Sequence, residues 1–155
     1  MKFPVENYAH VYPSTGILSW NFKRSETHRH RGVDLVAPIG TRVVAVASGV
    51  VEHAVQRPGT VGFRGYGRVI VLRLDTPRGT RALYAHLSAV YVKVGDRVSA
   101  GDVIGLVGDS CDTPSDPDHR CGGSHLHFEI AAKPYPMPAE ADRLDPGFFL
   151  EVKPS

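Results

Sequence analysis

The chain has 155 residues, of which 42% are apolar and 22% charged, and this balance is typical of a folded domain rather than a disordered chain. Lysine and arginine exceed aspartate and glutamate by 18 to 16, and a net charge of +2 is too small to indicate nucleic-acid binding. No stretch approaches the roughly 18 to 20 apolar residues that span a membrane, and residues 1–6 lack the apolar run of a secretory signal.

Short valine-rich runs predict strands rather than helices. The 16 glycines and 12 prolines interrupt the chain every few residues, and the runs between them alternate or are continuously apolar. In chain order, the predicted strands are 42–47, 49–51, 68–74, 90–94 and 103–107. Strands of this length and spacing predict a mainly β protein, an antiparallel sheet folded as a barrel-like sandwich with long loops. The longest predicted loop, 108–124, is of the kind that often carries function.

Two motifs contain candidate metal ligands. His30 and Asp34 form a His-x-x-x-Asp motif, and His125 and His127 form a His-x-His motif in a run that is typical of a strand. Because alternate residues of a strand share a face, His125 and His127 should point the same way, with the apolar residues between and after them in the core. Two imidazoles and one carboxylate are a common ligand set for catalytic zinc, which leaves a fourth position for water. These residues alone do not say which member of the His-x-His pair is the ligand.

Other chemistries fit parts of this pattern. Two histidines and a carboxylate also form the facial triad of iron oxygenases, although further histidines close by, such as His86 in the apolar run 83–87, favour hydrolysis. There is no His-Glu-x-x-His motif, which excludes the helical arrangement of many zinc proteases. A lipoyl-type carrier domain would need a lysine at a hairpin tip, and no lysine lies between Lys23 and Lys93.

Taken in order, these motifs resemble the M23 family of zinc endopeptidases, the lysostaphin and LytM class. The matching segments are 30–35, 37–43, 83–87, 92–98 and 125–129, and the resemblance covers about residues 19–150. It implies a LytM-like peptidase domain that fills the chain, 1–155, and that hydrolyses peptide cross-links or stem peptides of bacterial peptidoglycan. We expect a monomer with no nucleic-acid partner, located in the cell envelope, secreted, or delivered by a phage.

The resemblance also implies a role for each site residue. His30, Asp34 and His127 would bind one Zn²⁺ per chain, and His86 and His125 would be catalytic histidines that do not bind the metal. Because these residues are all present, the resemblance favours an enzyme over the family members that have lost ligands and regulate other hydrolases. The chain departs from the family at 19–23, where Ser-Trp-Asn-Phe-Lys stands in place of a Phe-Gly-x-Arg-like segment.

The two cysteines, Cys111 and Cys121, lie at either end of a polar stretch of the predicted loop. In an oxidising compartment they would form a disulfide that closes a short loop next to His125. The alternative is a second metal site formed by Cys111, His119 and Cys121, and the disulfide is favoured because no fourth ligand can be named.

Overall fold

The computed structural model describes residues 1–2, 4–5, 31–111, 124–136 and 142–144. Strands are the regular secondary structure of these residues, and none of them lies in an α-helix, so the predicted mainly β class is confirmed. The strands are β1 (Val33–Val36), β2 (Arg42–Val44), β3 (Gly49–Val55), β4 (Arg68–Leu74), β5 (Arg81–Val90), β6 (Arg97–Val98), β7 (Val103–Val107), β8 (His125–Ala131) and β9 (Arg143–Leu144). The described part of the chain contains no helix able to cross a membrane.

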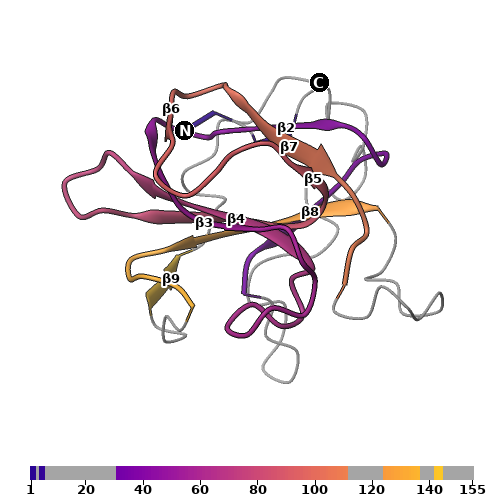
Figure 1. Ribbon diagram of the computed structural model, residues 1–155. Helices are drawn as coiled ribbons and strands as arrows, with labels where there is room; N and C mark the ends of the chain where they lie inside the picture. The colour runs from indigo at the N-terminus through magenta and orange to yellow at the C-terminus, as the bar shows by residue number, and fades with distance from the viewer. Residues whose placement is uncertain (3, 6–30, 112–123, 137–141, 145–155) are drawn as a thin grey trace.

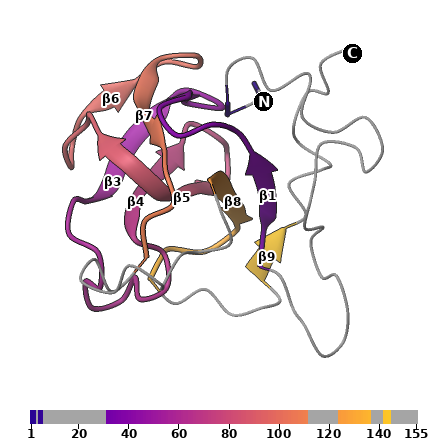
Figure 2. The ribbon, with the colours of Figure 1, turned by 90° about the vertical axis from the view of Figure 1, so that its right-hand side faces the viewer.

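All the strands belong to one antiparallel sheet that folds over itself. The hydrogen-bonded order is β1-β8-β5-β4-β3-β6, while β2 pairs with β7 and β9 with β8. The long strand β5 joins the two layers, because its first part lies between β4 and β8 and its last residues pair with β7. Figure 1 shows β2 and β7 above the layer of β3, β4 and β8, and Figure 2 shows the same arrangement after a quarter turn. This architecture agrees with the predicted barrel-like sandwich.

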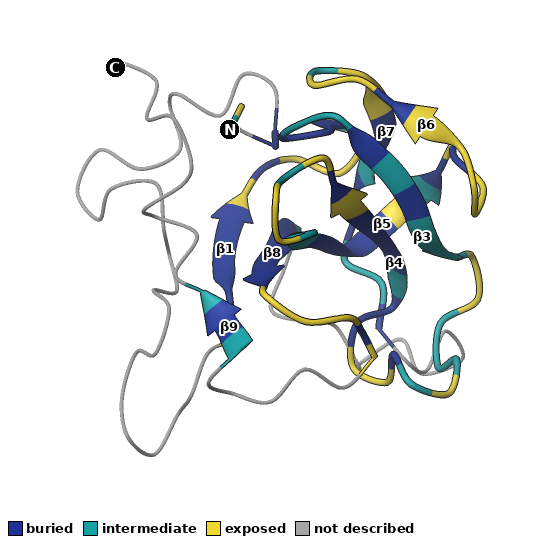
Figure 3. Ribbon diagram, turned by 90° about the vertical axis from the view of Figure 1, so that its left-hand side faces the viewer, coloured by how far each residue is buried: buried dark blue, intermediate teal, exposed yellow. Residues whose placement is uncertain are grey.

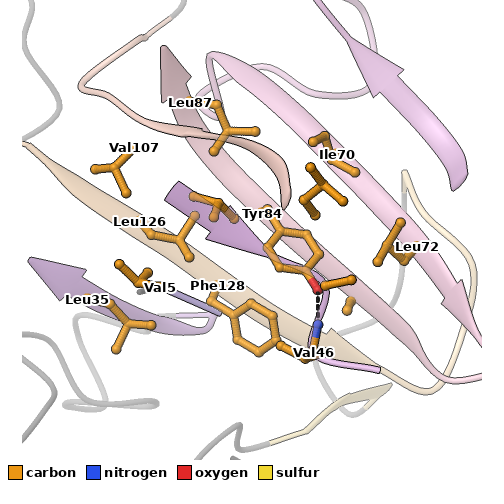
Figure 4. Packing of buried hydrophobic residues seen from close by; sticks show 14 of the residues in the cluster. Val5, Leu35, Val46, Ile70, Leu72, Tyr84, Leu87, Val107, Leu126 and Phe128 are labelled. Atoms are coloured by element: carbon orange, nitrogen blue, oxygen red, sulfur yellow. Dashed lines mark hydrogen bonds between the residues drawn. The ribbon is translucent and has the colours of Figure 1, made fainter. Parts of the chain in front are cut away.

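The main hydrophobic core lies between these layers (Figure 4). The rings of Tyr84 on β5 and Phe128 on β8 pack edge to face at its centre, with centroids 5.2 Å apart. The hydroxyl of Tyr84 accepts a hydrogen bond of 3.0 Å from the backbone N–H of Val46, so its buried polar atom is satisfied. Strand β8 is buried along its whole length (Figure 3), which makes it a rigid support for any side chain on its other face.

The other face of the sheet carries a second, smaller hydrophobic cluster. Because Leu126, Phe128 and Ile130 point into the main core, the alternate residues of β8 point to this second face. Its apolar members come from β4, β5, the segment between β3 and β4, and the end of β8 and beyond: Phe63, Tyr66, Val69, Val71, Leu83, Ala85, Ala131 and Tyr135. The candidate site residues of β8 therefore border an apolar surface rather than the main core.

Predicted and observed strands agree best where valine and isoleucine runs are buried. Segments 68–74 and 103–107 match β4 and β7. Segment 42–47 extends three residues beyond β2, 49–51 covers only the start of β3, and β1, β5, β6 and β9 were not predicted. The predicted strand 90–94 is wrong, because β5 ends at Val90 and a turn follows. In that turn Asp96 accepts a hydrogen bond from the Lys93 N–H, and Gly95 has a φ of 93°. Local turn chemistry thus outweighs the strand preference of the valines.

Candidate functional site

The antiparallel pairing of β1 with β8 brings together motifs that lie far apart in the sequence. Asp34 is directly opposite His127 in the register of the two strands. The Nδ1 atom of His127 lies 2.9 Å from Oδ1 of Asp34, and the same oxygen lies 3.7 Å from Nε2 of His125. The three side chains are buried. The predicted common face of His125 and His127 is confirmed, with the residues between and after them in the core.

His86 reaches this group through a β-bulge in β5. Opposite β4, Tyr84 pairs with Ile70 and Leu87 with Arg68, so two residues of β5 face a single residue of β4. The extra residue interrupts the alternation of the strand. His86 adopts the left-handed conformation with a φ of 61°, the only positive φ of a non-glycine residue in the described chain. As a result its ring lies beside His125 and His127, with centroid distances of 4.9 and 5.8 Å.

The bulge is held in place by the segment that follows β7. The carbonyl oxygen of Ser110 lies 2.9 Å from Nδ1 of His86, and a carbonyl can only accept, so Nδ1 carries the proton. The Ser110 hydroxyl donates to the carbonyl of Leu87 and accepts from the N–H of Arg68. Gly67 fits here because any Cβ at that position would collide with the Ser110 carbonyl. Because Nδ1 donates to the Ser110 carbonyl, the lone pair of the neutral His86 ring is on Nε2.

Burial strongly affects the ionisation of His86. Burial, together with electrostatic repulsion from the neighbouring histidines His127 and His125, lowers the pKa of the ring to about 3, against the opposing effects of the Ser110 carbonyl and the Asp34 charge. The imidazole of the metal-free chain is therefore uncharged near pH 7, with no proton on Nε2.

His127 lies between two carboxylates. Opposite its contact with Asp34, its Nε2 atom lies 2.8 Å from Oε2 of Glu129. Burial alone would lower the pKa of His127, but the hydrogen bonds and charges of Asp34 and Glu129 raise it to about 9. The metal-free chain thus holds an imidazolium that donates from both nitrogens. A cation placed between Asp34 and Nδ1 would replace one of these protons.

Glu129 is a site residue that our sequence analysis did not assign. It is fully buried, and burial alone would raise its pKa, but the hydrogen bond and charge of His127 lead the effects that lower it to about 2. Its second oxygen accepts a hydrogen bond of 3.0 Å from the Tyr135 hydroxyl and forms an ion pair of 2.9 Å with Nε of Arg143. The sequence signal was its spacing, because residue 129 shares the face of residues 125 and 127 on one strand.

Tyr66 lies against the same group. Its ring is 5.9 Å from that of His127. The hydroxyl is buried and makes no hydrogen bond of good geometry with the described residues. Burial raises the pKa of this hydroxyl, and the negative charge of Glu129 raises it further. Tyr66 therefore stays protonated, and its uncharged ring packs beside the imidazole of His127.

The donor set fits a divalent transition metal, although its predicted third ligand is not described. Asp34 and His127 place a carboxylate oxygen and an imidazole nitrogen side by side, which suits zinc. His30 lies outside the described residues, as do His28 and His119, the segment 19–23 and most of the loop 108–124. Within residues 31–111 and 124–144 as far as they are described, no three His, Cys, Asp or Glu side chains form a complete metal-binding group. The ligand role of His30 stays a prediction.

One of the two cysteines is described. Cys111 is buried and disulfide-bonded, and it follows directly on the Ser110 that contacts His86. The other cysteine of the sequence, Cys121, lies outside the described residues. A covalent link at Cys111 restrains the chain next to the bulge.

Comparison with known proteins places this geometry in a family. Residues 28–141 match the model of peptidase family M23. The chain is 38% identical over 108 residues to the DD-carboxypeptidase/endopeptidase Mpg of Neisseria meningitidis serogroup B, covering 70% of this chain and 21% of Mpg. It is 34% identical over 110 residues to the peptidoglycan DD-endopeptidase ShyA of Vibrio cholerae, covering 71% of this chain and 22% of ShyA. The chain thus spans about a fifth of the length of these curated relatives.

Solved structures show the same fold. The catalytic domain of the antimicrobial peptidase lysostaphin from Staphylococcus simulans superposes with a TM-score of 0.62 at 30% identity, and the match covers 86% of each chain. The family match includes Asp34, His86, His125 and His127, the residues that the sheet brings together. From the family model, the relatives and the fold together, this chain belongs to peptidase family M23.

Proposed function

We propose that this chain is a zinc-dependent endopeptidase that hydrolyses peptide cross-links or stem peptides of bacterial peptidoglycan. The observation that carries the proposal is the convergence of Asp34, His86, His125 and His127, all buried, on the second face of the sheet. Membership of the M23 family supports peptide-bond hydrolysis, and the peptidoglycan DD-endopeptidase activity in the name of ShyA supports the substrate class.

In this proposal, Asp34 and His127 bind the metal together with His30. Their contact places Nδ1 of His127, rather than Nε2, toward the carboxylate, because Nε2 is already bound to Glu129. When bound there, zinc would lower the pKa of a water molecule and polarise the substrate carbonyl. The buried carboxylates keep the local charge balanced, since a divalent cation would otherwise meet only neutral imidazoles.

His86 and His125 supply the proton transfers. The Ser110 carbonyl fixes the His86 proton on Nδ1, so that Nε2 is available to accept a proton from the attacking water. Nε2 of His125 lies 3.7 Å from Oδ1 of Asp34, so this ring also faces the proposed metal position. The leaving amine nitrogen then takes up a proton from one of the two histidines. Because the two rings are adjacent, the group that takes the proton from water and the group that gives one to the amine lie on the same side of the site.

Metal content and activity test this proposal together. One zinc per chain should copurify, and His30→Ala, Asp34→Ala and His127→Ala should each lose the metal and the release of new amino groups from purified peptidoglycan. Glu52→Gln is a matched control, because Glu52 is a carboxylate of the same sheet that pairs with Arg81. Full zinc occupancy in all three variants, or a zinc-loaded protein that releases no amino groups from any wall type, would contradict the proposal.

A further inference from the structure

We propose that Glu129 is a positioning residue that fixes the orientation and proton of His127 for metal binding, and that Tyr135 and Arg143 hold Glu129 in place. This inference rests on the proposed function for its metal, and it assigns a task to residues that do not themselves bind the metal.

The first support is the contact between Glu129 and His127. The two residues are separated by one position on β8 and therefore share a face. Oε2 of Glu129 lies 2.8 Å from Nε2 of His127, on the side of the ring opposite Asp34. An acceptor at Nε2 keeps a proton on that nitrogen, so the lone pair of the neutral ring is on Nδ1 and faces Asp34. The carboxylate also prevents the ring from rotating away.

The second support is the way in which Glu129 itself is held. A fully buried carboxylate is costly unless it is paired and hydrogen-bonded. Its other oxygen, Oε1, has two partners, the Tyr135 hydroxyl at 3.0 Å and Nε of Arg143 at 2.9 Å. The Arg143 guanidinium also lies 6.0 Å from the centre of the Tyr135 ring. The two oxygens thus have separate tasks, one toward His127 and one toward the support.

The third support is that the backbone delivers these partners. Arg143 is on β9, which pairs with β8 directly after Glu129, with Leu144 opposite Ile130 and Arg143 opposite Ala131. The N–H of Ala132 donates a hydrogen bond of 2.7 Å to the carbonyl of Asp142, which fixes the start of β9. Leu144 of this strand packs against the main core, while Arg143 contacts Glu129, so the pairing and packing of β9 hold the Arg143 side chain beside the carboxylate. Through Arg143 and then Glu129, β9 is therefore linked to the proposed metal ligand His127.

The contacts predict a specific defect when the carboxylate is changed. A glutamine at 129 keeps the shape but offers one acceptor oxygen. If that oxygen faces Nε2 of His127, the amide NH₂ faces the Arg143 guanidinium, so the ion pair is replaced by a contact between two proton donors without a negative charge. Loss of such a partner of a metal-binding histidine typically weakens metal binding by about 10- to 100-fold. Tyr135→Phe removes only one hydrogen bond to the carboxylate and should weaken zinc binding by a smaller factor, on the order of fivefold.

The test is the zinc dissociation constant, measured by competition with a chromogenic chelator on the folded protein. Glu129→Gln and Tyr135→Phe should raise it as stated. Tyr84→Phe is the matched control, because it also removes a buried tyrosine hydroxyl bond, that to Val46, on the opposite face of the sheet. Tyr84→Phe should lower the melting temperature but leave the dissociation constant unchanged. In zinc-loaded protein, nitrogen-15 NMR of His127 should show the proton on Nε2.

An unchanged dissociation constant in Glu129→Gln would overturn the inference, and so would equal weakening by Tyr135→Phe and Tyr84→Phe. If Glu129→Gln does not fold, the comparison of the two tyrosine variants still decides. Zinc binding is measured without substrate, so a protein whose affinity follows these predictions but which cuts no peptidoglycan would contradict the proposed function alone.

Discussion

At the scale of single residues, His127 is the centre of the site because both of its nitrogens have a carboxylate partner. In the metal-free chain each nitrogen of His127 donates a proton to its carboxylate partner. The proton between Nδ1 and Asp34 takes the place of the proposed metal. Metal binding and proton binding therefore compete at Nδ1. His86 is affected in the opposite direction, since burial and neighbouring positive charge disfavour its protonation.

These opposite shifts predict a pH of maximum stability for the metal-free protein. The pKa of His127 is raised from 6.5 to about 9 by Asp34 and Glu129 despite its burial, so its contribution is complete below pH 6.5 and is lost as the pH rises to about 9. The pKa of His86 is lowered from 6.5 to about 3 by burial, so stability falls as the pH drops below 6.5. Denaturant unfolding in the presence of a chelator should therefore give the highest free energy of unfolding near pH 6.5.

The His86→Phe variant separates the two effects. It should remove the decline in stability that begins as the pH falls below 6.5 and leave the decline toward pH 9 in place. The loss below pH 4.5 should remain, because the pKa of Glu129 is lowered from 4.5 to about 2. A free energy of unfolding that rises steadily from pH 6 to pH 9 in the metal-free protein would contradict the assignment of a charged His127.

The two histidines outside the proposed ligand set give a second prediction at this scale. His86→Ala and His125→Ala should keep zinc but lose wall-degrading activity by about 10²-fold or more, as expected for general acid-base groups. Zinc content and the rate of amine release on purified peptidoglycan measure the two properties separately. Loss of zinc in His125→Ala, with zinc kept in His127→Ala, would show that the roles of these neighbours are reversed.

At the scale of elements, the site depends on close contacts between strands. Gly32, just before β1, lies so near β8 that an added Cβ would collide with the Phe128 carbonyl and come within 2.8 Å of Cγ of Glu129. The glycine lets β1 approach closely enough for Asp34 to reach His127.

Gly32→Ala should therefore damage both stability and metal binding. Overpacking of this kind costs about 1 to 3 kcal/mol, and the strand shift should separate Asp34 from His127 and weaken zinc binding. Gly40→Ala is the comparison, because Gly40 has open space around its Cα and only its φ of 90° makes the alanine unfavourable. The melting temperature should fall in both variants, but zinc affinity should fall only in Gly32→Ala. Equal zinc affinities would show that the approach of β1 does not set the site.

The elements also show what sequence reasoning can and cannot predict. The alternation of β8 was enough to place His125 and His127 on one face, because a regular buried strand obeys a period of two. The same rule applied to β5 would turn His86 into the main core, since its neighbour Ala85 belongs to the second cluster. The bulge that reverses this depends on Ser110, a residue 24 positions away that contacts the His86 ring. Such tertiary contacts leave no periodic signal in the sequence.

At the scale of the whole molecule, the predicted sheet architecture is confirmed. The order of the motifs in the sequence predicted the M23 family, which the family model confirms. The sequence did not predict the β9 contact, because Arg143 is an isolated basic residue whose partner Glu129 is recognisable only once β9 pairs with β8. Since the chain spans about a fifth of its curated relatives, the wall type and the bond cut belong to the proposal rather than to the family assignment.

Mass spectrometry of fragments released from purified peptidoglycan is the most direct test of zinc-dependent wall hydrolysis. Walls with direct stem-peptide links and walls with glycine bridges should be compared. The zinc-loaded protein should release fragments from at least one of them by cutting a peptide bond, with the sugar chain intact, and chelator treatment or Asp34→Ala should abolish the release. Fragments produced by cleavage of the sugar chain, or identical release by Asp34→Ala, would contradict the account.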